Sequence, residues 1–231
     1  MLDLTRFKVL TFDCYGTMID WEGGIFAALR PLLAAHDKKL SDSALLALYA
    51  ELEVTAEQGK YLRYREVLQS VVRGFGQHLG FSPTAAEVCS LPESLATWQP
   101  FPDTVEALRK LSSRYQLAVI SNIDDDLFAA SASKLEVAFS HVITAEQAGC
   151  YKPCMNIFRL AEKRIGVSRG LWLHAGQSIY HDVIPAQSLG LATVWVNRRS
   201  PRPGAGAAKA AAAKPDLEVP DLRTLAKLAE N

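Results

Sequence analysis

Short apolar runs of strand type alternate with stretches of helical periodicity over most of this chain. The first run, residues 9–12, is rich in β-branched and aromatic side chains and predicts a buried strand. Further strands are predicted at residues 117–122, 141–144, 171–174 and 191–196, and helices at residues 125–133, 155–165 and 179–189. Such alternation predicts an α/β fold, with a doubly wound, Rossmann-like parallel sheet and helices on both of its faces.

Two local signals refine this pattern. Asp103 and Glu106 have the spacing of a capping box, which predicts a helix beginning after Asp103. The tract GAGAAKAAAAKP at residues 204–215 is low in complexity and predicts a mobile surface loop. A short strand and a closing helix are expected after this tract.

Residues 23–98 differ from the rest, because no strand-like run interrupts their helical periodicity. Apolar residues recur at helical spacing in two sets, Ile25, Leu29 and Leu32, and then Leu45, Leu48, Tyr49 and Leu52. A broad apolar face follows over residues 61–79, and Ser82-Pro83 predicts the start of another helix. We therefore expect a helical cap domain, residues 19–98, inserted after the first strand of a core domain formed by residues 1–18 and 99–231.

The composition is that of an ordinary globular protein. The 231 residues are 49% hydrophobic and carry a formal net charge of zero, so no bulk charge indicates a nucleic-acid or membrane partner. Neither an export signal nor a membrane-spanning run is evident, and we expect a cytoplasmic location. The four cysteines are then expected to be reduced, and the spacing of Cys150 and Cys154 is wrong for a Cys-x-x-Cys motif.

Polar side chains follow the predicted strands at the points where the strands end. These residues are Asp13 and Thr17, then Ser121 and Asn122, then Lys152, and finally Gln177, Ser178 and Asp182. Because the carboxyl ends of parallel strands meet at one edge of a sheet, where ligands bind, the sequence predicts a single site there.

Four short motifs in this order, FDCYGT, VISN, YKP and GQSIYHD, resemble the ordered motifs of the haloacid dehalogenase superfamily. The resemblance covers nearly the whole chain, including the helical insert and the ATVWVNR strand. It implies that Asp13 is a nucleophile. Phosphatases of this superfamily typically have a second aspartate two residues later as general acid, where this chain has Tyr15.

The Tyr15 and Gln177 positions are more similar to the L-2-haloacid dehalogenase branch than to the phosphatases. A phenol, with a pKa of about 10, is a poor proton donor to a leaving alkoxide, whereas a halide leaves without a proton. Gln177 stands where the phosphatases commonly have a magnesium-binding aspartate, and only Asp182 is retained. The resemblance therefore implies a hydrolase without a metal or other cofactor.

In such an enzyme, Asp13 would displace halide from C2 of a small anionic 2-substituted carboxylic acid, and water would hydrolyse the resulting ester to a 2-hydroxy acid. The resemblance implies that Lys152 steadies Asp13. Thr17, Ser121 and Asn122 would bind Asp13 or the substrate carboxylate, and Asp182, with Ser178 or Gln177, would orient or deprotonate the water. Ser178 is equally explained as a helix cap. We expect no other partner and leave a homodimer open.

The chain departs from the L-2-haloacid dehalogenase pattern in two places. An apolar residue in the helix around residues 45–52 replaces the cap arginine that binds the substrate carboxylate, and Phe158 replaces a tyrosine. The resemblance implies that Phe158 and Tyr15 contact the substrate. Arg63 or Arg65 is then a candidate anchor, although an exposed helix face explains both. Two alternatives stay open, a divergent phosphatase and a non-catalytic binding protein. His181 is expected in a surface or cap contact, and Trp21, Trp98 and Trp195 in packing.

Overall fold

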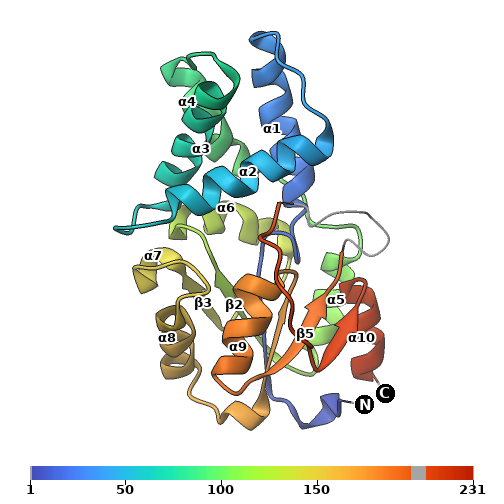
Figure 1. The fold of residues 1–231 in the computed structure, drawn as a ribbon. Coiled ribbons are helices and arrows are strands. Elements are labelled where there is room, and N and C mark those ends of the chain that lie inside the picture. The colour runs from blue at the N-terminus through green and yellow to red at the C-terminus, as the bar shows by residue number, and fades with distance from the viewer. Residues whose placement is uncertain (1, 199–206, 231) are drawn as a thin grey trace.

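The computed structural model describes residues 2–198 and 207–230 of the chain. Its centre is a six-stranded parallel sheet in the order β3-β2-β1-β4-β5-β6 (Figure 1). The strands are β1 (Val9–Phe12), β2 (Gln116–Ser121), β3 (His141–Thr144), β4 (Trp172–Gly176), β5 (Ala192–Val196) and β6 (Leu217–Val219). Helices cover both sides of this sheet, so the predicted α/β fold is confirmed.

The helices that pack around the sheet follow the predicted alternation. They are α5 (Thr104–Ser112), α6 (Asp125–Leu135), α7 (Ala145–Ala148), α8 (Met155–Ile165), α9 (Ile184–Ser188) and α10 (Leu222–Glu230), with short helical turns η1 (Leu4–Arg6) and η3 (Arg169–Leu171). The helix predicted at residues 179–189 is divided, because a π-helical turn, η4 (Ile179–Val183), precedes α9. In the part of the chain that is described, no helix is long and apolar enough to cross a membrane.

Strand β1 lies in the middle of the sheet and is fully buried. Val9, Leu10 and Phe12 have no exposed surface, as expected for a strand with a neighbour on each side and helices on each face. Phe12 pairs with Val119 of β2 and Ala175 of β4. The residue that follows β1, Asp13, therefore emerges at the centre of the carboxyl edge of the sheet.

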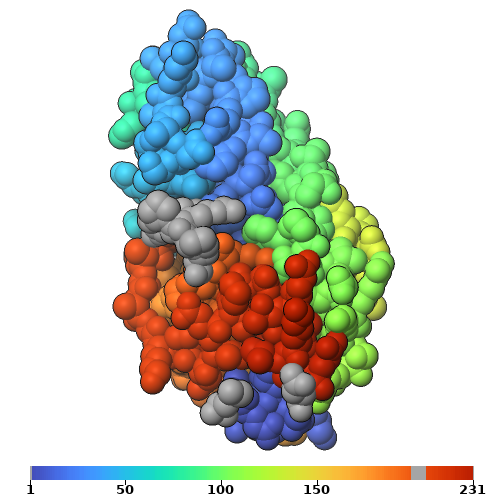
Figure 2. Space-filling view, turned by 90° about the vertical axis from the view of Figure 1, so that its right-hand side faces the viewer, coloured from blue at the N-terminus to red at the C-terminus, as the bar shows by residue number. Residues whose placement is uncertain are grey.

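The insert after β1 forms four helices, α1 (Trp21–Ala35), α2 (Asp42–Ala56), α3 (Tyr64–Leu79) and α4 (Ala85–Ser94), and a short turn, η2 (Leu95–Thr97). These helices stand together over the carboxyl edge of the sheet (Figure 1), and Figure 2 shows that they form one end of an elongated molecule. Ile25, Leu29 and Leu45 are buried, as their spacing predicts. The division into two domains at residues 18/19 and 98/99 stays a prediction.

One predicted helix start and one predicted side-chain cap are wrong. Helix α4 begins at Ala85 and not at Pro83, because Thr84 and Glu87 form the capping box. Asp103 does precede α5, but its side chain does not cap that helix. It accepts hydrogen bonds from Arg198 (2.6 Å) and from the backbone N–H of Leu222 (2.9 Å), and so ties the start of α5 to the end of the chain.

Part of the low-complexity tract is buried in the protein. Residues 204–206 lie outside the described residues, but Ala207 and Ala208 are buried, with 1% and 8% of their surface exposed. The backbone N–H of Ala207 donates to Glu22 of α1 (3.2 Å). The prediction of a surface loop is therefore wrong for these two alanines, whose small side chains let the backbone pass close to α1.

Candidate active site

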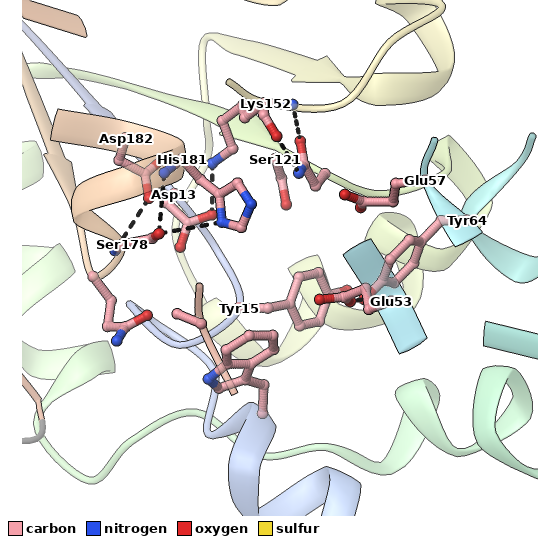
Figure 3. A pocket seen from close by; sticks show the side chains of 14 residues that line it. Asp13, Tyr15, Glu53, Glu57, Tyr64, Ser121, Lys152, Ser178, His181 and Asp182 are labelled. Atoms are coloured by element: carbon pink, nitrogen blue, oxygen red, sulfur yellow. Dashed lines mark hydrogen bonds and ion pairs between the residues drawn. The ribbon is translucent and has the colours of Figure 1, made fainter. Parts of the chain in front are cut away.

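Asp13 and Lys152 form a buried ion pair at the carboxyl edge of the sheet (Figure 3). The Lys152 Nζ donates to Asp13 Oδ1 (2.8 Å), to Asp182 Oδ1 (2.6 Å) and to the backbone oxygen of Ile120 (3.0 Å). An ammonium group has three protons to donate, so all three are used. We call Asp13, Lys152 and Asp182 the Asp–Lys–Asp cluster.

The backbone of Lys152 is fixed by Asn122, which follows β2. The Asn122 side-chain oxygen accepts from the backbone N–H of Lys152 (2.6 Å), and its amide nitrogen donates to the Lys152 carbonyl (3.3 Å). Asn122 also lines the cavity in front of Asp13. Its contacts are those of a residue that positions Lys152, whereas the sequence analysis expected a contact with Asp13 or with substrate.

Thr17 holds the other oxygen of Asp13. Its hydroxyl donates to Asp13 Oδ2 (2.7 Å) and accepts from the backbone N–H of Gln177 (2.8 Å). The turn between them needs Gly16, whose φ is +89° and where a Cβ would lie 2.9 Å from the Trp21 ring nitrogen. Both carboxylate oxygens of Asp13 are therefore oriented before any ligand arrives.

The ionisation of the Asp–Lys–Asp cluster is asymmetric. Burial opposes the charge on Asp182, but Lys152 and His174 outweigh it and hold the Asp182 pKa below its usual value. For Asp13, burial outweighs Lys152 and raises the pKa, and the charge on Asp182 adds to this increase. Asp13 is thus the more basic carboxylate of the two, which favours it as the nucleophile, while the weakly basic Asp182 is better suited to orient water than to deprotonate it.

Ser178 and Gly176 place Asp182 beside Lys152. The Ser178 hydroxyl accepts from the backbone N–H of His181 (3.0 Å), so it caps η4, and the Ser178 backbone N–H lies 3.3 Å from Asp182 Oδ2. A Cβ on Gly176 would meet the Asp182 side chain at 2.5 Å, so only glycine lets Asp182 fold back against β4. Ser178 and Gln177 both line the cavity.

The hydroxyl of Tyr15 is not available as a general acid. The hydroxyl lies 2.8 Å from Ser131 Oγ of α6, and the ring packs edge-on against Trp98. Burial raises the pKa of Tyr15 well above its ordinary value. A phenol with this environment does not supply a proton to a leaving alkoxide at neutral pH.

Ser121, at the end of β2, brings an unused polar group to the cavity. It is 1% exposed, lines the cavity, and its hydroxyl has no hydrogen-bond partner among the described residues. Buried hydroxyl groups without a partner are rare because they cost free energy. The Ser121 hydroxyl is therefore available to a ligand.

Arg63, Arg65 and Phe158 do not line this cavity. The Arg63 guanidinium pairs with Glu146 of α7, and Arg65 pairs with Asp126 of α6 (2.7 Å), with about half and about two-fifths of the side chains exposed. Both arginines thus tie the start of α3 to the core. Phe158 is fully buried and packs edge-on against His174. The expectation that either arginine or Phe158 contacts substrate is not met in this arrangement.

Replacing Arg63 or Arg65 with alanine is expected to leave KM for a small carboxylic acid within about twofold of the wild-type value, because exposed ion pairs outside the cavity contribute little. Steady-state kinetics of the two variants would measure this. A rise of roughly tenfold or more in KM for one variant alone would restore that arginine as the substrate anchor.

Sequence reasoning missed several residues that line the cavity. They are Trp21, Glu53, Glu57, Tyr64, His181 and Ala208. His181 makes the cap contact expected of it, with its Nδ1 3.1 Å from the Ser178 hydroxyl, but it also lines the cavity, and burial lowers its pKa to about 4, so its ring is neutral at neutral pH. His174, also missed, lies 3.3 Å from Asp182. Glu53 had a detectable signal, since it is a charged residue four positions after Tyr49 on an otherwise apolar helix face.

The cavity is small. Its volume of about 40 Å³ has room for about three water molecules, at roughly 10–15 Å³ each. The Asp–Lys–Asp cluster forms its floor, and residues of α1, α2 and α3 form its roof (Figure 3). This size suits the reacting end of a small molecule.

The structure thus has a central parallel sheet, an aspartate held by a buried lysine at the carboxyl edge of that sheet, and a set of helices over both. The family described as haloacid dehalogenase-like hydrolase matches residues 7–190. The chain therefore belongs to this family.

Named relatives lie in two branches of the family. The chain is 25% identical over 229 residues to (S)-2-haloacid dehalogenase of Pseudomonas sp. (strain YL), covering 96% of this chain and 94% of the relative. It is 27% identical over 198 residues to glyceraldehyde 3-phosphate phosphatase of Methanothermobacter thermautotrophicus, covering 82% and 85%. The L-2-haloacid dehalogenase of Xanthobacter autotrophicus has been solved with chloropropionic acid covalently bound. It matches this chain with a TM-score of 0.78 at 20% identity, covering 97% of this chain and 98% of the other, so the two proteins share the fold.

The residues beside Asp13 do not fit a magnesium ion. Over residues 2–198 and 207–230, no three His, Cys, Asp or Glu side chains are arranged to hold a metal. The Lys152 ammonium already lies within 2.8 Å of both Asp13 and Asp182, and Gln177 adds no carboxylate for a metal ion. The mechanism below therefore uses no metal.

Proposed function

We propose that this hydrolase is a metal-independent enzyme of the 2-haloacid dehalogenase type. Asp13 displaces halide, or a related leaving group, from C2 of a small carboxylic acid. The observation that carries the proposal is the pairing of a preoriented Asp13 with a single buried cation, Lys152, in a site where the Tyr15 hydroxyl is bound to Ser131. Such a site supports loss of a group that leaves without a proton.

The first step forms one bond and breaks one. A carboxylate oxygen of Asp13 attacks C2, and the halide leaves with the electron pair of the carbon–halogen bond. Lys152 offsets the negative charges that Asp13, Asp182 and the substrate carboxylate bring together. The Ser121 hydroxyl, unpartnered among the described residues and lining the cavity, would donate to the substrate carboxylate.

The second step hydrolyses the aspartyl ester. Water adds to the Asp13 carbonyl carbon, and the bond breaks between that carbon and the former Asp13 oxygen now attached to C2. The product leaves as a 2-hydroxy acid with that oxygen, and Asp13 is regenerated with the oxygen of water. The overall reaction consumes one water and releases one halide and one proton. Asp182 and Ser178 are polar groups beside Asp13 that would orient this water.

The second candidate is a phosphatase, which the archaeal phosphatase relative favours. A magnesium phosphatase needs an acid for the leaving alkoxide and carboxylates for the ion, and Tyr15 and Gln177 supply neither. Retention of both Asp13 and Lys152 in direct contact argues against a non-catalytic binding protein.

The two enzymes are separated by their metal dependence. We expect halide release from L-2-chloropropionate, or from an amino derivative of it, to continue unchanged in excess EDTA, because Lys152 already balances the charge of the site. Phosphate esters are expected to be hydrolysed poorly at every Mg²⁺ concentration. Phosphate release that disappears on chelation and returns with Mg²⁺, without any dehalogenation, would establish the phosphatase instead.

A further inference from the structure

The roof of the cavity carries two carboxylates. Glu53 in the last turns of α2 and Glu57 directly after it are four residues apart, so they lie on one face of the helix, and both line the cavity that contains Asp13 (Figure 3). Glu53 is 7% exposed. In the described residues, no lysine, arginine or histidine lies within ion-pair distance of either side chain.

The surroundings of Glu53 are arranged around an ionised carboxylate. The hydroxyl groups of Tyr49 (2.9 Å) and Tyr64 (2.7 Å) both donate to Glu53 Oε1. Two donors on one oxygen suit a carboxylate, which accepts hydrogen bonds and has none to give. Burial nevertheless raises the pKa of Glu53. The pKa of Glu57 is also raised, by burial and by its neighbour Glu53, and the more distant charge of Lys152 offsets this only in part. A positive charge between them would offset both effects.

The charges of the cavity do not suit a ligand that is only an anion. The buried cation of the site, Lys152, already has two carboxylate partners, Asp13 and Asp182. Two further carboxylates on the roof would repel the carboxylate of a simple 2-haloacid brought close to them. Their position demands a partner with positive charge.

An independent observation shows that this cavity is built for a ligand. The Ser121 hydroxyl is buried, has no protein partner among the described residues and lines the same cavity from the floor. One end of the cavity thus offers a hydroxyl donor next to the nucleophile. The other end offers the carboxylates of Glu53 and Glu57, for which the described residues supply no cation at ion-pair distance. A ligand with a carboxylate at one end and an ammonium group at the other complements both ends.

We infer that Glu53 and Glu57 bind a protonated amine, and that the substrate class is small carboxylic acids that carry both a leaving group on C2 and an ammonium group. This inference rests on the proposed function for the leaving group, but its charge argument concerns ligand binding alone. Glu53 and Glu57 are then specificity-determining residues, with Tyr49 and Tyr64 holding Glu53 in place.

Binding of unreactive amino acids tests the charge argument without any turnover. We expect β-alanine or 4-aminobutyrate to bind the wild-type protein at least ~10-fold more tightly than propionate or butyrate, measured by calorimetry, because a buried charge pair is formed. Glu53→Gln and Glu57→Gln should each remove most of that preference. In Glu53→Gln, the new amide oxygen can still accept from both tyrosines, so the fold is expected to survive.

Two controls keep this result specific. Glu51→Gln removes an exposed carboxylate from the same helix and should leave the preference unchanged. 3-Hydroxypropionate has an uncharged donor in place of the ammonium group and should bind about as weakly as propionate. Any of three results would overturn the inference. The first is equal binding of 3-hydroxypropionate and β-alanine, and the second is equal binding of propionate and β-alanine together with no preference for 4-aminobutyrate. The third is a loss of the preference in Glu51→Gln that equals the loss in Glu53→Gln or Glu57→Gln.

Turnover separates this inference from the proposed function. We expect halide release from 3-amino-2-chloropropionate to exceed that from 2-chloropropionate by roughly 10-fold or more in kcat/KM, after subtraction of release without enzyme. Glu57→Gln should remove most of this difference. Preferred turnover of 2-chloropropionate would overturn the inference and leave the dehalogenase proposal intact. Tight binding of β-alanine without halide release from either compound would support the cation site and count against the dehalogenase proposal.

Discussion

An Asp13→Asn variant is expected to lose halide release by at least ~10⁴-fold, on the scale seen when a covalent nucleophile is removed. The reason is that Asp13 combines a position at the carboxyl edge of the sheet with preorientation of both oxygens by Lys152 and Thr17. The amide of asparagine is a far weaker nucleophile than a carboxylate. Asp126→Asn, which changes an exposed carboxylate on α6, is the matched control and should retain activity.

The path of the water oxygen distinguishes covalent catalysis from direct attack. In a single turnover in heavy-oxygen water, the label is expected in the side chain of Asp13 and not in the hydroxy acid, because water attacks the carbonyl carbon of the ester. Mass spectrometry of the peptide containing Asp13 would locate the label. Label in the first-turnover product would mean that water attacks the substrate carbon itself, and Asp13 would then be a base.

Replacing Lys152 with methionine is expected to reduce kcat/KM by at least ~100-fold at neutral pH, the scale of losing one electrostatic stabiliser. Methionine keeps an unbranched side chain of similar size but leaves the buried carboxylates of Asp13 and Asp182 without their cation. The pKa of Asp13 should rise, so the ionised nucleophile forms only at higher pH, and the residual activity should increase with pH. Lys163→Met, at an exposed position of α8, is the control.

The Lys152→Met substitution is also expected to change how the stability of the protein depends on pH. Without Lys152, the folded-state pKa values of Asp13 and Asp182 rise above those of the unfolded chain, so folding is favoured at low pH and disfavoured as pH increases through them. Urea denaturation should therefore show a larger loss of stability at pH 8 than at pH 5, relative to wild type. A folded Lys152→Met protein with near-normal turnover and an unchanged pH profile would remove Lys152 from the site.

The sheet and the floor of the site could be predicted from the sequence, because each depends on a local pattern. A buried run of four residues defined β1, and the parallel topology then placed Asp13, Ser121, Lys152 and Asp182 at one edge without knowledge of any long-range contact. Where local pattern was ambiguous, the prediction failed. Asp103 has the spacing of a cap, yet its carboxylate is used by Arg198 from the far end of the chain.

The roof of the site could not be predicted in the same way. Helical periodicity shows which face of α2 is buried but not what that face meets. Glu53 stands out in the sequence as a charge on an apolar face, but neither Glu53 nor Glu57 could be assigned to the cavity until α2 was placed over Asp13. Arg63 and Arg65 show the converse. Their charge suggested an anchor, but both point to acidic partners on α6 and α7 at the junction of cap and core. Such pairings are set by tertiary contacts.

The buried alanines after β5 have a consequence for ligand size. Ala208 presents only a methyl group to the cavity, and the Asp–Lys–Asp cluster forms no hydrogen bond with it. A valine or leucine at this position would narrow the cavity while every donor and acceptor around Asp13 keeps its partner. The size of the largest ligand that fits can thus change through Ala208, which takes no part in bond making. Evolution can alter the size of the substrate there and leave the reacting residues unchanged.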